Sequence, residues 1–238
     1  MKNTSKSLRT ALLATVAAAA VVTGIARADS PAAPTKLLSA SFAPRQVVQV
    51  EVGDFHFRPG QIAPVHGHDA PAVGYVAKGA ILYQVEGEKP QMLQAGDAFY
   101  EPTGKRILRF DNASATGEAI FIDFNLQQEG EPFIVFEEQP SESIDRRPLP
   151  TIDIADRTVS GVDVYTRDLA AGGSVSLDTT AATLGLVAGG IVEITIPGGE
   201  TVRVIAGNSF AVPADAAGVW IVNASSEIPA EIITFHLR

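Results

Sequence analysis

The sequence predicts an all-β protein with two tandem domains. From residue 46 onward, short runs of β-branched and aromatic residues alternate with Gly, Pro and Asn, which is typical of a β-sandwich or β-barrel. The chain also repeats itself at a constant distance, and beyond the N-terminal segment no long stretch shows the 3.6-residue period of a helix. Together these observations predict one β-rich module that is present twice.

The repeat has a constant offset of 111 residues. Gly74–Gly79 returns as Gly185–Gly190, and Pro102 returns as Pro213. Further pairs at this offset are Ala95–Asp97 with Ala206–Asn208, Asn112–Ser114 with Asn223–Ser225, Phe124 with Phe235, and Leu126 with Leu237. The period is too long for a solenoid, so we expect each copy to be a domain with its own core.

The N-terminal segment has the features of a secretory signal peptide. A basic start is followed by an apolar run, Ala11–Ile25, and by Ala26–Ala28, a small-x-small cleavage site. We expect removal of residues 1–28 and a secreted or periplasmic protein after cleavage near Ala28-Asp29. An uncleaved anchor is the alternative, although the run is shorter than the ~20 apolar residues of a membrane-spanning helix.

Composition limits the partners. Four of the 18 basic residues lie in residues 1–28, so the remaining chain has 14 basic against 27 acidic residues, a net charge of −13. Such a surface repels nucleic acid and anionic lipid, and we expect neither as a partner of the mature protein. The absence of Cys excludes thiolate metal sites and Cys nucleophiles.

The domain boundaries follow from local composition. We expect a Pro/Ala-rich tether over residues 29–45, a first barrel over 46–126, an acidic and Pro-rich linker over 127–150, and a second barrel over 151–238. The linker contains one apolar patch, Phe133–Phe136, which we expect to pair with the other domain's sheet, because a free apolar edge favours aggregation.

His66 and His68 are the first candidate site residues. Side chains at i and i+2 of a strand share a face, so both imidazoles point the same way and can chelate one first-row metal. The alternative is that both are neutral, hydrogen-bonded histidines of a pocket.

The surroundings of this pair resemble the cupin family, small jelly-roll barrels with a metal site inside. The family's first motif, Gly–His-x-His–Glu–Gly, matches at Gly60, His66, His68 and Gly79, but its Glu position is Ala72. The resemblance implies two tandem cupin-type β-barrel (jelly-roll) domains and a metal held by the motif's ligands.

The second motif, Gly–Pro-x-Gly–His–Asn, keeps Gly96, Pro102 and Gly104. Its His position is Ile107 and its Asn position is Asp111, so two of the four family ligands remain. The resemblance therefore implies no metal or a weakly bound divalent metal (Mn, Fe or Zn).

The second copy has fewer ligands still. At the 111 offset His66 and His68 become Leu177 and Thr179, and with one residue of slip near Gly172 they become Asp178 and Thr180. We expect this barrel to be structural, or to act as a lid or in dimerisation.

A complete metal site would need a substitute third ligand. The candidates are His56, Asp69, Tyr100, Glu101 and Asp123. Glu101 is the first to test, because it ends a strand near the position from which the family's third His would approach. His56 is expected to face outward between two core phenylalanines.

Three functions are open from the sequence. The first is an exported protein that binds a small organic molecule in its N-terminal barrel, with ligand contacts from His66, His68, Tyr75, Tyr83, Tyr100 and Arg109. The second is a metal-dependent oxygenase, decarboxylase or isomerase that uses His66 and His68. The third is a structural or regulatory protein with vestigial pockets. A homo-oligomer is compatible with each.

Overall fold

The structure, a computed structural model, describes residues 33–177, 180–216 and 218–238. The expected signal peptide and residues 29–32 of the tether lie outside these ranges, as do Asp178 and Thr179. Within the described residues the regular secondary structure consists of strands alone, and no helix is long and apolar enough to cross a membrane.

The strands of the first half are β1 (Thr35–Phe57), β2 (His66–Gly67), β3 (Ala72–Lys78), β4 (Ala80–Val85), β5 (Gln91–Gln94), β6 (Ala98–Glu101), β7 (Arg106–Asn112), β8 (Ala119–Gln127) and β9 (Val135–Phe136). Those of the second half are β10 (Asp145–Leu169), β11 (Ser174–Ser176), β12 (Thr183–Gly189), β13 (Ile191–Thr195), β14 (Thr201–Ile205), β15 (Ser209–Val212), β16 (Trp220–Asn223) and β17 (Ala230–Leu237).

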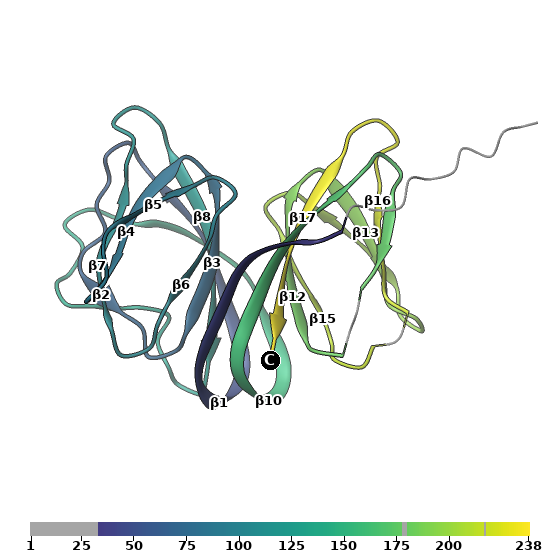
Figure 1. Ribbon diagram of the computed structural model, residues 1–238, viewed down its shortest axis with the longest axis horizontal. Helices are drawn as coiled ribbons and strands as arrows, with labels where there is room; N and C mark the ends of the chain where they lie inside the picture. Colours follow the sequence, from purple (N-terminus) through teal and green to yellow (C-terminus); the bar gives the residue numbers. More distant parts are fainter. Residues whose placement is uncertain (1–32, 178–179, 217) are drawn as a thin grey trace, which may run out of the picture.

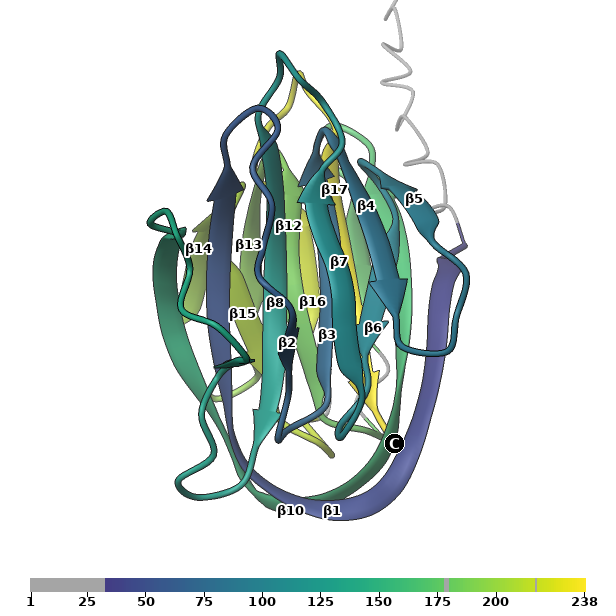
Figure 2. The same cartoon turned by 90° about the vertical axis from the view of Figure 1, so that its left-hand side faces the viewer.

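Two barrels share one continuous sheet (Figures 1 and 2). The eight-stranded sheet has the order β15-β12-β17-β10-β1-β8-β3-β6. In the first barrel its half faces the sheet β5-β4-β7-β2-β9, and in the second it faces β11-β16-β13-β14. The predicted all-β fold with two tandem jelly-roll barrels is thus confirmed.

Alternation along each strand assigns side chains to separate cores. In β3, Val76 joins the phenylalanine-rich core of the first barrel, whereas Val73 and Tyr75 point to the opposite face. That opposite face, together with its counterpart in the second barrel, forms a third core between the barrels. A period of two places one set inside and the other outside, as expected for strands with both faces buried.

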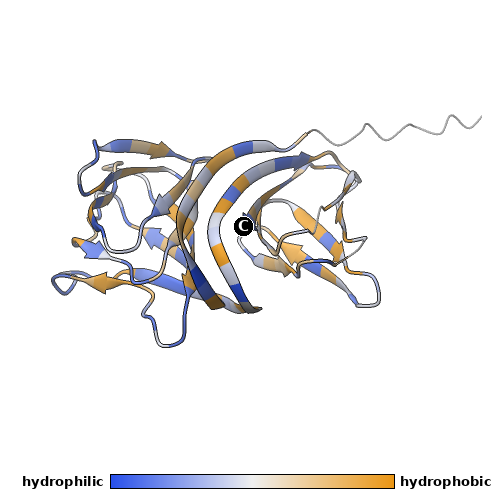
Figure 3. Cartoon of the chain, turned by 60° about the horizontal axis from the view of Figure 1, so that its bottom comes forward, coloured by the Kyte–Doolittle hydropathy of each residue, from blue (hydrophilic) through white to orange (hydrophobic). Residues whose placement is uncertain are grey.

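The long antiparallel pair β1 and β10 joins the barrels and curves between them (Figure 3). Phe124 of β8 and Phe235 of β17 meet there, with ring centroids 4.5 Å apart, although β1 and β10 separate their strands in the sheet. The sheet therefore folds on itself and buries apolar side chains of both halves, which favours a fixed arrangement of the two barrels.

Equivalent positions make equivalent contacts. Gly74 leaves room for the ring of Phe99 on the neighbouring strand, and Gly185 does the same for Phe210, where an added Cβ would lie 2.2 Å and 2.0 Å from the rings. Asn112 donates to three backbone carbonyls and Asn223 to three corresponding ones. These matches support a duplicated module.

Two boundaries differ from the expectation. β1 begins at Thr35, so the tether is wrong over residues 35–45, where pairing with β10 overrides the Pro- and Ala-rich composition. β10 begins at Asp145, inside the expected linker. The apolar patch of the linker also pairs differently, because β9 adds to β2 of the first barrel rather than to the other domain.

Candidate metal centre

His66 and His68 lie on one face of the short strand β2 and its continuation, inside the first barrel. His66 is opposite Ile107 of β7 on one side and opposite Phe136 of β9 on the other. Both histidines are 3% exposed, and their ring centroids are 5.5 Å apart. The expected common orientation of the two imidazoles is confirmed.

Backbone carbonyls fix the state of both rings. His66 Nδ1 lies 2.8 Å from the Pro64 carbonyl oxygen, and His68 Nδ1 lies 3.0 Å from that of Phe133. A carbonyl only accepts, so each Nδ1 carries the proton and donates it. In the neutral rings the Nε2 atoms are left as lone-pair donors, which is the arrangement of metal-ligating histidines.

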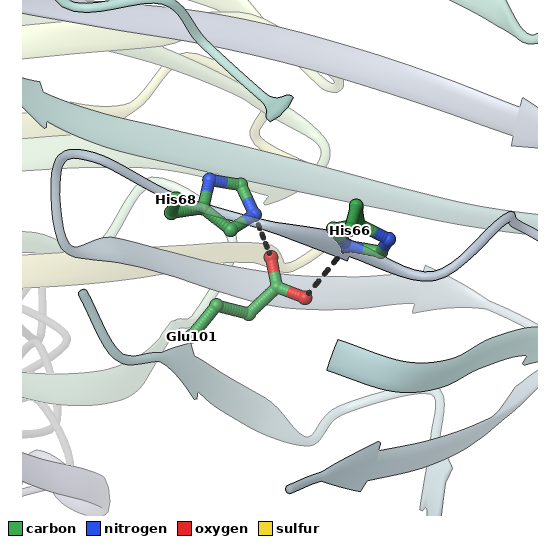
Figure 4. Close-up of side chains that lie close together, drawn as sticks. All are labelled: His66, His68 and Glu101. Atoms are coloured by element: carbon green, nitrogen blue, oxygen red, sulfur yellow. Dashed lines mark ion pairs between the residues drawn. The ribbon is translucent and has the colours of Figure 1, made fainter. Parts of the chain in front are cut away.

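Glu101 supplies a carboxylate to the same point (Figure 4). It ends β6 directly before Pro102 and is opposite Ala72 of β3, so the two residues share a face. His68 Nε2 is 3.1 Å from Glu101 Oε2, and His66 Nε2 is 3.5 Å from Oε1. The carboxylate thus comes from the strand next to the position where the cupin motif has its Glu.

The three side chains need a cation between them. Their ligand atoms lie within 4.8 Å of one another, and all three residues are buried. His68 Nε2 and Glu101 Oε1 have no hydrogen-bond partner of good geometry. Two imidazole lone pairs that face a buried carboxylate repel it, and either a proton or a metal ion relieves this repulsion.

The protonation of the metal-free cluster follows the same logic. Burial disfavours protonated His68, but the Glu101 carboxylate outweighs burial and raises the pKa of His68 to about 9. Burial also disfavours the Glu101 carboxylate, yet the imidazoles hold its pKa below the ordinary range. The cluster therefore retains a proton where an ion would otherwise sit, and these residues fit a divalent metal.

The cavity beside the cluster is small and aromatic. It has a volume of about 20 Å³ and is lined by Phe55, Phe57, Phe110, Phe121, Phe133 and Phe136, together with the three polar side chains. That space accommodates about one water molecule. The linker forms one side of this cavity, because Phe133 and Phe136 belong to the segment between β8 and β10; we call residues 133–136 the cover.

Interactions hold this cover in place. The Phe133 carbonyl accepts from His68 and from Asn125 Nδ2, the latter at 3.0 Å. The Arg146 guanidinium lies 3.9 Å from the centroid of the Phe133 ring and also pairs with Glu51. The cover is thus hydrogen-bonded directly to a histidine of the cluster.

Asp123 of β8 is a further buried carboxyl group in this cavity. It is 2% exposed, and its Oδ1 has no hydrogen-bond partner. Burial, reinforced by the charge of Glu101, raises the pKa of Asp123 to about 8 in the metal-free protein. A bound divalent cation would act in the opposite direction.

The remaining candidate ligands lie elsewhere. His56 points away from the barrel interior, as expected, and its ring nitrogens lie 3.2 Å from Asp54 and 3.2 Å from Glu118. Asp69 is exposed. Of the proposed substitutes, only Glu101 joins the cluster, and Asp123 lines the same cavity.

The structure does not bring the other expected ligand contacts to this cavity. Tyr75 and Tyr100 alternate with inward residues of β3 and β6 and therefore face the core between the barrels. Tyr83 lies inside the barrel, but its hydroxyl donates to the Tyr100 carbonyl. Arg109 points outward and pairs with Asp111 at 2.7 Å.

The second barrel carries no such cluster among its described residues. Gly60 and Gly172 both have positive φ at an offset of 112, whereas later pairs such as Gly79 and Gly190 keep 111. The slip expected near Gly172 is therefore present. Thr180 then takes the place of His68, and Val212 that of Glu101.

Sequence reasoning did not find the Phe133 carbonyl or Asn125. Neither has a sequence signal, since a backbone carbonyl is present in every residue and Asn125 matches no motif position. Their roles depend on the path of the linker across the barrel.

Comparisons with known proteins agree with this fold. The family described as "Cupin domain" matches residues 53–125. No curated protein matches the sequence. Among solved structures, AerE from Microcystis aeruginosa has 16% identity over 83% of this chain and 98% of its own, with a TM-score of 0.55.

Two further structures extend the likeness. Oxalate decarboxylase from Bacillus subtilis, whose description refers to Mn(II) centres, has 14% identity over 85% of this chain and 74% of its own, with a TM-score of 0.57. Vicilin from hazelnut, Corylus avellana, has 14% identity over 84% and 85%, with a TM-score of 0.56. Identities this low show the fold alone. Residues 53–125 therefore belong to the cupin superfamily, and the fold of the described chain is a tandem arrangement of two such barrels.

Proposed function

We propose that the first barrel binds one divalent transition metal through His66, His68 and Glu101, and that the protein uses this centre in catalysis on a small organic molecule. The observation that carries the proposal is the convergence of three buried acceptor atoms, two of which lack a hydrogen-bond partner of good geometry. A proton satisfies such a cluster incompletely, whereas an ion satisfies all three atoms together.

The donor set selects the kind of metal. Two neutral imidazoles and one carboxylate suit Mn, Fe or Zn, and the single carboxylate leaves a net charge of +1 with a divalent ion. Two histidines and one carboxylate with open positions are typical of non-haem iron oxygenases, so oxidation of a small organic substrate is the reaction class that we favour. A bound metal would supply Lewis acidity or redox chemistry here.

The chain's own residues would do the remaining work. Six phenylalanines exclude water from the cavity and strengthen electrostatic interactions in it. The Phe133 and Pro64 carbonyls keep both Nε2 atoms aimed at the ion. Asp123 is the further carboxyl group in the cavity and can hold or release a proton there.

A substrate requires movement of the cover. The cavity, at about 20 Å³, holds about one water molecule. The segment that carries Phe133–Phe136 must therefore move for an organic molecule to reach the centre, and its return would exclude water. Binding of a small molecule without metal is the second candidate, and it needs the same movement.

The cellular setting is also proposed. The N-terminal pattern supports export to the periplasm or medium after cleavage near Ala28-Asp29, with an acidic mature chain that avoids nucleic acid and membranes. Sequencing of the N-terminus of protein from the producing cell tests this, and a retained Met1 would contradict it.

The metal proposal is tested by elemental analysis of protein purified without chelator. We expect up to one Mn, Fe or Zn per chain, lost in a His66→Ala/His68→Ala variant that stays folded. Arg109→Gln serves as the control, because Arg109 points away from the cavity. Equal metal content in both variants would refute the site.

A further inference from the structure

The linker between the barrels crosses the first barrel as a strap, residues 128–144, which contains the cover. The ring of Phe133 is packed inward, with its centroid 5.7 Å from that of Phe55, and the residue is 6% exposed. The ring of Phe136 lies 5.9 Å from the ring of His66, centroid to centroid. The strap therefore forms one wall of the cavity at the metal centre through contacts that its movement would break.

The backbone of the strap is held to the barrel over a short length. Its strand β9 has two residues and lies at the edge of the sheet, beside β2. Next to this pair, the Glu137 amide donates to the Val65 carbonyl at 3.0 Å. Near the start of the strap, Gly130 has a φ of 79° and no atom within 4 Å of where a Cβ would lie, so the backbone can rotate there without a clash. Segments with few backbone hydrogen bonds open at a lower free-energy cost than long central strands.

Ion pairs supply the rest of the fastening. In three of them a glutamate of the strap pairs with an arginine of the first barrel, and in a fourth Arg146, close after the strap, pairs with Glu51. The three strap pairs are Glu131 with Arg45, Glu137 with Arg106, and Glu142 with Arg58. The acidic composition of the linker thus complements the charges of the barrel beneath it.

These pairs lie at or near the surface. Arg45 and Glu131 are the least exposed, with 12% and 19% of their side chains accessible, and Arg45 also donates to the Asp69 carbonyl at 3.0 Å. Arg106 and Glu137 form an exposed bidentate pair, with distances of 2.5 Å and 2.8 Å. Exposed ion pairs contribute little individually and weaken as salt is added. Together they form a fastening that can be released without unfolding of the sheets.

We propose that the strap opens as one element while both barrels stay folded, and that the ion pairs of Glu131, Glu137 and Glu142 set the fraction of molecules in which it is open. Opening would uncover the cavity at the metal centre, and this fraction would rise with ionic strength. Access of an organic molecule by this route rests on the proposed function, whereas the movement itself does not.

Hydrogen exchange of the metal-stripped protein, followed by mass spectrometry of its peptides, tests the movement. We expect the amides of residues 133–137 to exchange faster than those of β3 and β8. Glu131→Gln should raise exchange in the strap by about two- to fivefold, and Glu131→Gln/Glu137→Gln/Glu142→Gln by about tenfold or more, with β3 and β8 unchanged. Glu193→Gln, which removes the exposed partner of Arg203 in the second barrel, is the control and should leave the strap unchanged.

Salt distinguishes the ion pairs from other effects of the substitutions. The Debye length falls from about 10 Å at 0.1 M salt to about 3 Å at 1 M, so exchange in the wild-type strap should rise about threefold or more, and that in the triple variant should change little. Melting curves verify that the variants are folded, and Glu137→Gln, which alters one exposed side chain, replaces the triple variant if that does not fold.

Equal salt dependence in the wild type and the folded variant, or exchange of the strap at the same rate as β3 and β8, would overturn the proposal. All samples are free of metal, so neither result depends on whether the protein binds one. Elemental analysis tests that question separately.

Discussion

Glu101→Gln tests two roles of Glu101, as the negative partner of His68 in the metal-free protein and as a ligand of the bound metal. The substitution keeps the shape of the side chain but removes the charge and one metal ligand. In the metal-free protein the carboxylate oxygen lies 3.1 Å from His68 Nε2 and, against the effect of burial, raises the pKa of His68 to about 9, whereas the new amide can only donate to a neutral imidazole. The substitution removes this ion pair, so we expect the metal-free variant to be less stable than the metal-free wild type near neutral pH.

Added metal widens the difference in stability between the two proteins. A metal at a hundred times its Kd stabilises the folded state by ~2.7 kcal/mol. For a chain of this size ~1 kcal/mol corresponds to roughly 2–4 °C in Tm, so wild type should gain about 5–10 °C. Loss of a ligand should lower the metal affinity by at least the ~100-fold seen for second-shell changes. At the same metal concentration the variant is then near its Kd, so metal stabilises it by only ~0.4 kcal/mol, about 1 °C in Tm.

The assay is a thermal melt of each protein, stripped of metal and then with added Mn, Fe or Zn. Glu118→Gln is the matched control, because Glu118 also lies 3.2 Å from a histidine, His56, but on the outer face. It should keep the full metal-induced shift. A Glu101→Gln protein with an undiminished shift, or a wild type with none, would refute the three-ligand centre.

Three further results are expected. Ala72→Glu in the Glu101→Gln background should recover at least about tenfold in metal affinity, because Ala72 and Glu101 are opposite on one face; no recovery in a folded double variant would mean that Ala72 does not face the histidines. Gly74→Ala should destabilise the fold by ~1–3 kcal/mol in denaturant titrations, because its Cβ would lie 2.2 Å from the Phe99 ring, and a neutral effect would argue against this packing. The metal-free protein should lose stability as pH rises from about 6.5 to 9, because the folded-state pKa of His68 is about 9 and its stabilising proton is lost over that window. Asp123 acts in the same direction, since the folded protein retains on it a proton that the unfolded chain releases. Melting temperatures across pH with chelator measure this, and a rise over the same interval would contradict it.

Much of the fold could be predicted from the sequence because turns are local. The repeated glycines at positive φ and the capping asparagines, Asn112 and Asn223, recur at fixed offsets and mark the same turns in both barrels. The strand over residues 35–45 could not be predicted, because its hydrogen bonds are made to β10, far away in the sequence. The linker's path over the first barrel was mistaken for the same reason.

The site was predictable only in part. His-x-His on a strand fixes the relative direction of two side chains, so His66 and His68 follow from local geometry. Glu101 follows only once β6 is known to lie beside β3, and the motif alone points to Ala72 instead. The tyrosines were assigned to the cavity by chemistry, whereas strand alternation directs Tyr75 and Tyr100 to the core between the barrels.

Anomalous diffraction from crystals of the metal-loaded protein tests the metal centre most directly. We expect one strong peak per chain, within about 2.0–2.6 Å of His66 Nε2, His68 Nε2 and a carboxylate oxygen of Glu101, and none in the second barrel. No peak at this position, or a peak that Glu101 does not reach, would contradict it.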